Sequence, residues 1–186
     1  MQAVPHPSAE EARDNATFDA LLWALSRPGL ARTLSAPGEG TIITALLDRE
    51  CRAYCADPRM LPEIMRSGAE VTEITRADHV FLGSMSTNDA LHAVAIGSDL
   101  YPDDGATVVI RAKIGVGPPL RMTGPGIDGE IVVRIGDLPE GFWATRAARL
   151  RYPMGFDLFF LDGDQVVGVP RSTVVLTADL DTKGQI

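Results

Sequence analysis

The stretch of sequence that decides the fold is FDLFFLDGDQVVGV, residues 156–169. Its two apolar runs, Phe156–Leu161 and Gln165–Val169, flank Asp162-Gly163-Asp164, and this pattern predicts a β-hairpin. Upstream, strands are predicted at the Val- and Ile-rich segment 107–114, at 120–123 and at the β-branched segment 130–135. The second half of the chain is therefore expected to be mostly strand.

Helices and shorter extended segments alternate in the first half. Phe18, Leu21, Leu22 and Leu25 recur at helical spacing and predict one apolar stripe on a helix that ends near Ser26, before Pro28-Gly29. Further helices are predicted at 42–49, 58–66, 87–96 and 138–150, and extended segments at 51–56, 71–74 and 79–83. This order predicts an α/β fold, a single-domain layered sandwich on a mixed β-sheet. We expect a flexible N-terminal segment at 1–15, the domain at 16–178 and a C-terminal tail at 179–186.

Composition and charge exclude several classes of protein. The 186 residues suit one domain, and a net charge of −8 argues against binding to nucleic acid, which attracts clustered basic residues. The start of the chain lacks the features of a signal peptide, and no apolar run approaches the roughly 18 residues of a membrane helix, so a cytoplasmic location without membrane contact is expected. Cys51 and Cys55 would lie about 13 Å apart on one strand face, too far for a disulfide.

The usual motifs of catalysis are missing from the sequence. It contains no H-E-x-x-H motif, no Cys-x-x-Cys pair and no G-x-S-x-G elbow, and Gly115-Val116-Gly117 is followed by Pro118-Pro119 where a dinucleotide turn would open a helix. A pyridoxal-phosphate enzyme needs a lysine, but Lys113 lies in a predicted strand and Lys183 in the tail. We therefore predict no catalytic residues, no metal site and no cofactor.

Three segments place Arg, Ser or Thr beside Gly or Pro, and they supply the candidate site. They are Ser26–Gly29, Leu120–Ile127, and the pair formed by Tyr152–Asp157 with Gly168–Thr173. Turns explain such segments, since Gly and Pro fix turn geometry. A sharper interpretation is a surface that recognises an anion or a partner. Its candidate residues are Arg121, Thr123, Gly124, Gly126, Asp157, Arg171, Ser172 and Thr173. Asp157 could instead form a buried structural ion pair with one of the arginines.

These segments, in this order, resemble the PhnH family of phosphonate metabolism. Residues 18–29, FDALLWALSRPG, resemble its F-x-x-L-x-x-A-M-S-x-P-G opening, with Leu25 in the Met position. Residues 120–127 resemble its L-x-x-T-G-x-G-I segment. Residues 152–158 are similar to F-P-L-G-x-D-L, with Tyr152 and Met154 as departures, and residues 169–173 to L/I-P-R-T-T, with Ser172 for the first Thr. The resemblance spans about 18–175, and no motif matches between 41 and 105.

The resemblance implies a subunit of the carbon–phosphorus lyase core complex, assembled with PhnG, PhnI and PhnJ and homodimeric when isolated. It implies a contribution to forming ribose 1-alkylphosphonate 5-triphosphate from ATP and an alkylphosphonate, within a transferase complex, while the radical cleavage belongs to PhnJ. The implied fold is that of pyridoxal-phosphate-dependent transferases without the cofactor site. Two alternatives stay open: a subunit that binds the nucleotide or phosphonate through Arg121 and Arg171, and a stand-alone enzyme. Trp23, Trp143 and Tyr152 could contact a partner, although burial in the core is favoured for each.

Overall fold

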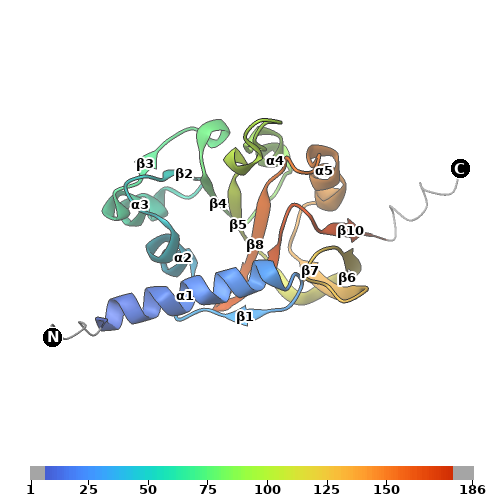
Figure 1. Ribbon diagram of the computed structural model, residues 1–186, viewed down its shortest axis with the longest axis horizontal. Helices are drawn as coiled ribbons and strands as arrows, with labels where there is room; N and C mark the ends of the chain where they lie inside the picture. Colours follow the sequence, from blue (N-terminus) through green and yellow to red (C-terminus); the bar gives the residue numbers. More distant parts are fainter. Residues whose placement is uncertain (1–6, 178–186) are drawn as a thin grey trace, which may run out of the picture.

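The computed structural model describes residues 7–177, and a seven-stranded mixed sheet lies at its centre (Figure 1). Neighbouring strands follow the order β1-β9-β8-β5-β4-β2-β3. Their bounds are β1 Arg32–Thr33, β2 Arg52–Cys55, β3 Glu70–Val71, β4 His79–Gly83, β5 Thr107–Arg111, β8 Asp157–Asp162 and β9 Gln165–Val169. The five strands from β3 to β8 in this order pair in parallel, whereas β9 and β1 run antiparallel at one edge. The predicted mixed sheet and the predicted hairpin of residues 156–169 are both confirmed.

Three helices cover one face of this sheet. They are α1 (Ala9–Ser26), α2 (Glu39–Leu46) and α3 (Leu61–Ser67). Leu21, Ile42 and Ile64 from these helices pack against the side chains that the central strands send to this face, Phe81, Val109, Phe159 and Leu161. Because the alternate residues of the same strands are also buried, both faces of the sheet carry a core, as expected for parallel strands.

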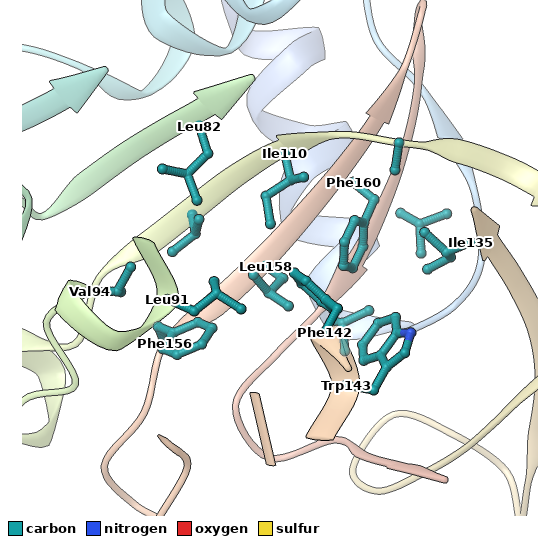
Figure 2. Packing of buried hydrophobic residues seen from close by; sticks show 14 of the residues in the cluster. Leu82, Leu91, Val94, Ile110, Ile135, Phe142, Trp143, Phe156, Leu158 and Phe160 are labelled. Atoms are coloured by element: carbon teal, nitrogen blue, oxygen red, sulfur yellow. The ribbon is translucent and has the colours of Figure 1, made fainter. Parts of the chain in front are cut away.

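The opposite face is covered by two short helices and a second sheet. The helices are α4 (Asp89–Ala93) and α5 (Phe142–Arg149), and the antiparallel sheet has the order β10-β6-β7, with β6 Lys113–Thr123, β7 Ile131–Gly136 and β10 Val174–Leu176. Figure 2 shows Phe142 and Trp143 of α5 packed beside Phe160 of β8. The three rings have centroids 5.1 to 5.8 Å apart, within the range of favourable aromatic pairs.

Three short 3₁₀-helices lie in the connections: η1 (Pro58–Met60), η2 (Ile74–Arg76) and η3 (Pro102–Asp104). The last of these lies in the connection between α4 (Asp89–Ala93) and β5. The crossover after β2 uses α3 on one face of the sheet, and the crossover after β4 uses α4 on the other. The connections therefore diverge between β2 and β4, the kind of place where open α/β sheets form a crevice beyond the carboxyl ends of their strands.

The first helix differs from the prediction in its start and in its buried face. Residues 9–15, expected to belong to a flexible segment, form its opening turns behind a capping box of Ser8 and Glu11, while residues 1–6 lie outside the described part of the chain. The predicted apolar stripe is wrong in part, because Phe18 is 51% exposed and Leu22 55% exposed, whereas Leu21 is buried. Small residues complete the inner face instead: Thr17, Ala20 and Ala24.

Several other bounds also differ. The strand predicted at 107–114 ends at Arg111, and the one predicted at 120–123 is the last part of β6, which begins at Lys113 and runs through Pro118-Pro119 by way of a register shift. Helix α5 begins at Phe142 after Gly141, not at Leu138, and β10 was not predicted. Trp143 is buried as favoured, but Trp23 and Tyr152 are not core residues, with 42% and 74% of their surface exposed.

Candidate functional site

Arg171 and Asp157, two of the predicted site residues, form a structural ion pair. The side chains are 17% and 19% exposed, and Arg171 Nη2 lies 2.8 Å from Asp157 Oδ2, while the Arg171 backbone N–H donates to Asp157 Oδ1 at 2.7 Å. The same guanidinium donates to the carbonyl oxygens of Pro102, at 2.5 Å, and Gly105, at 3.3 Å. Arg171 therefore ties the start of β8 to the loop that contains η3. This is the structural alternative that the sequence left open.

The predicted glycines serve close packing between the motif segments. A side chain at Gly126 would be driven into the carbonyl oxygen of Ser26, and one at Gly124 would meet the carbonyl oxygen of Ser172 at 2.9 Å. The backbone of β6 also pairs with β10, with Thr123 opposite Val174. Segments 26–29, 120–127 and 170–173 thus adjoin in space. They meet through their backbones, as expected for turns.

Thr173 is buried against Arg146, a residue that sequence reasoning missed. Arg146 is 2% exposed, and its guanidinium donates to the carbonyl oxygens of Thr173, at 3.1 Å, and Pro170, at 2.8 Å. Burial lowers the pKa of Arg146 to about 10. Arg146 thus closes the 170–173 turn from inside, and a helix written FWATRAAR gives no signal that its first arginine faces inward.

Arg121 lies apart from this buried network. It belongs to the exposed side of β6 and forms an ion pair of 2.9 Å with Glu130, with 49% of its side-chain surface open to solvent. Each of the two predicted arginines thus has its own carboxylate, Glu130 for Arg121 and Asp157 for Arg171. Of the two, Arg121 is the one that retains open surface for a ligand.

The sequence did not predict a hollow at the carboxyl edge of the main sheet. It has a volume of about 430 Å³ and lies where β4, β5 and β8 end, next to the point where the crossovers diverge. Its polar lining comes from Glu39 at the start of α2 and from Ser84, Arg111, Lys113, Asp137 and Asp162. The volume falls within the range of small-molecule pockets, roughly 300–1,000 Å³.

The cations of this hollow are balanced by carboxylates. Arg111 forms an ion pair with the buried Glu39, and its Nη2 lies 3.9 Å from Asp57 Oδ2. Lys113 Nζ lies 2.9 Å from Asp162 Oδ1. The hydrogen bond from Lys113 to Asp162 lowers the pKa of Asp162, and the same bond raises the pKa of Lys113. The hollow is thus polar with a nearly balanced charge, rather than a cationic pocket.

The residues of this edge do not fit pyridoxal phosphate. A Schiff base requires a neutral amine, whereas Asp162 holds Lys113 as an ammonium ion. Elsewhere, Cys51 and Cys55 are free thiols whose pKa values are raised by burial, which disfavours the reactive thiolate. Between residues 7 and 177 no three His, Cys, Asp or Glu side chains come together as a metal site would require. No helix in the same range has the length and apolar character to cross a membrane.

Fold and site together define a layered α/β protein in which buried charges fasten loops to the sheet. Comparison with known proteins then identifies the family: the model of the bacterial phosphonate metabolism protein (PhnH) matches residues 8–176. The chain belongs to the PhnH family. It is also 32% identical, over 93% of each chain, to the "Putative C-P lyase subunit protein HtxG" of Stutzerimonas stutzeri. The family resemblance seen in the sequence is therefore confirmed, and with it a role in phosphonate metabolism.

Proposed function

We propose that this chain is a subunit of a carbon–phosphorus lyase complex without catalytic residues of its own. In this role it contributes to forming ribose 1-alkylphosphonate 5-triphosphate from ATP and an alkylphosphonate. Family membership carries the proposal. The geometry supports it, because the side chains of Arg171, Asp157 and Arg146 form hydrogen bonds with other parts of the same chain.

The expected partners are subunits of the PhnG, PhnI and PhnJ types, in the cytoplasm, with a homodimer as the isolated form. Co-expression with these subunits, followed by native mass spectrometry, tests this assembly. A stable complex that contains the chain in equal copy with its partners is the expected result. A chain that stays apart as a homodimer would overturn the proposal.

Direct binding of the nucleotide or phosphonate through Arg121 and Arg171 is the second candidate. The half-exposed side chain of Arg121 favours it, whereas Arg171 is enclosed. Replacing Arg121 with Ala separates the two functions, since Arg121 belongs to the exposed side of its strand. Loss of ATP binding by an intact complex would support the ligand role. Unchanged ATP binding would support the assembly role only.

A further inference from the structure

An exposed apolar pair lies at the tip of the loop between α4 and β5. Leu100 is 84% exposed and Tyr101 is 60% exposed. In the isolated chain such exposed apolar side chains add little to the packing of the fold. Tyrosine is among the residues that anchor protein interfaces. We call residues 97–105 the Leu100 loop.

The Leu100 loop is fastened at both ends. Ile96 and Gly105 form an antiparallel bridge, and the Ser98 N–H donates to the Tyr101 carbonyl oxygen at 3.0 Å while Ser98 Oγ accepts from the Tyr101 N–H at 3.1 Å. From inside, Arg171 donates to the carbonyl oxygens of Pro102 and Gly105. A loop held in this way presents its apolar tip at a low cost in conformational entropy on binding.

Acidic side chains surround the apolar tip. Asp99, Asp103 and Asp104 are all exposed, and residues 97–105 contain no basic residue. Asp104 also borders a hollow of about 360 Å³ that Arg52 and Arg76 line, so its charge is partly balanced. Asp99 and Asp103 form no ion pair with any residue between 7 and 177, and they leave the tip with a negative rim.

We propose that the Leu100 loop is the surface through which this chain docks on another subunit of its complex. The partner surface is an apolar pocket that takes Leu100 and Tyr101 and is edged by Lys or Arg side chains facing Asp99 and Asp103. The proposal rests on the proposed function and adds the contact surface to it. Arg171 is then a positioning residue, which holds the loop without touching the partner.

A second copy of the chain fits this loop less well than a basic partner. Two loop tips facing each other would bring four unpaired carboxylates together, and like charges across an interface oppose association. The tip is too small for an interface of the usual size, about 800 Å² on each partner. The neighbouring turn adds Tyr152, since the Gly155 N–H donates to the Ile96 carbonyl oxygen at 2.8 Å, and the adjoining hollow adds polar surface.

The decisive experiment co-expresses the double variant Leu100→Ser/Tyr101→Ser with the other core subunits. Native mass spectrometry is expected to find its share in the complex reduced by about tenfold or more, equivalent to about 1.4 kcal/mol. The matched control is Phe18→Ser/Leu22→Ser, which removes another exposed apolar pair, 51% and 55% exposed, from α1 and is expected to assemble as the wild type does. If the loop variant assembles normally, or if both variants lose assembly equally, the proposal is overturned. If the wild type itself fails to assemble, the proposed function fails.

A second arm tests the charge of the rim. In Asp99→Asn/Asp103→Asn we expect the association rate with the partner subunits to fall at low salt and to depend less on ionic strength than that of the wild type. An unchanged salt dependence would contradict the basic edge of the partner pocket. Analytical ultracentrifugation of the isolated Leu100→Ser/Tyr101→Ser variant provides a third reading. Conversion of a wild-type dimer to monomer would assign the loop to self-association and overturn the proposal.

Discussion

At the scale of single residues, Arg171 is the most connected side chain of the predicted site. Arg171→Ala would remove the guanidinium that pairs with the Asp157 carboxylate, which would keep only the backbone N–H of residue 171, and would leave two loop carbonyl groups without a donor. We therefore expect a loss of about 3 kcal/mol in the free energy of unfolding. Arg171→Lys should recover only part of this loss, because an ammonium group cannot replace the guanidinium fork. Urea denaturation of the three proteins measures the difference. Equal stability of the wild type and the alanine variant would contradict the structural role.

Gly126 allows a second test, because its backbone lies against another segment of the chain. It has φ of +84°, and an added Cβ would be driven into the carbonyl oxygen of Ser26. Gly129 has φ of +70° with nothing within 4 Å, so Gly129→Ala measures the backbone cost alone, about 1 kcal/mol. Gly126→Ala should cost clearly more, about 3 kcal/mol in all, by urea denaturation. Equal losses at both positions would mean that segments 26–29 and 120–127 do not meet closely.

At the scale of elements, α1 tests which face of a helix enters the core. Leu21 is 2% exposed and its neighbour Leu22 is 55% exposed, although both were predicted for one apolar stripe. We expect Leu21→Ala to lower the free energy of unfolding by about 3 kcal/mol, because it leaves a cavity, and Leu22→Ala to change it by less than about 0.5 kcal/mol. The substitutions are chemically identical and adjacent, so helix propensity cancels between them. Similar losses in the two variants would restore the predicted stripe.

The crevice at the carboxyl edge predicts a pH dependence. Hydrogen bonds from Arg59 lower the pKa of Asp57 to about 2 from 3.8. A depressed pKa contributes stability that is present above the unfolded value and is lost as the pH falls through the folded value. The free energy of unfolding should therefore decrease between about pH 4 and pH 2, and it should decrease less steeply in Asp57→Asn. Urea denaturation at each pH measures the free energy of unfolding of the two proteins. Parallel pH curves would show that the ion pair with Arg59 does not stabilise the ionised form of Asp57.

The elements show what the sequence could and could not predict. The strands at 79–83 and 165–169 match their predicted bounds, because apolar runs between turn residues are a local signal. The full length of β6 was not predicted, because Gly and Pro normally end strands. Here the pairing with β7 continues beyond them after a register shift between Ile114 and Pro119. β10 consists of three residues whose pairing depends on β6 and leaves no pattern of its own.

At the scale of the whole molecule, the order of the strands and the grouping of the motifs were out of reach of the sequence. At the edge of the sheet β1 pairs antiparallel with β9, although Thr33 and its partner Gln165 are 132 positions apart in the sequence. Such long-range pairing is set by tertiary packing. The motifs supplied the candidate residues, but what each side chain contacts depends on its direction: Arg171 faces inward to a loop, and Arg121 lies on the exposed side of a strand. Arg111 and Glu39 were missed because 72 positions separate them and neither belongs to a motif.

The two cores on opposite faces of the sheet predict cooperative unfolding of the whole molecule. β4, β5 and β8 contribute side chains to both cores, so neither layer can lose its packing without exposing the strands that support the other. Trp23→Phe leaves Trp143, which is buried between α5 and β8, as the only tryptophan. In urea, the fluorescence of Trp143 reports the core on the side of α5, and far-ultraviolet circular dichroism reports all helices and strands. We expect the two signals to give one transition with the same midpoint, as two-state unfolding requires. A lower midpoint for the fluorescence would mean that α5 and the small sheet unfold on their own, and that the molecule is not a single cooperative unit.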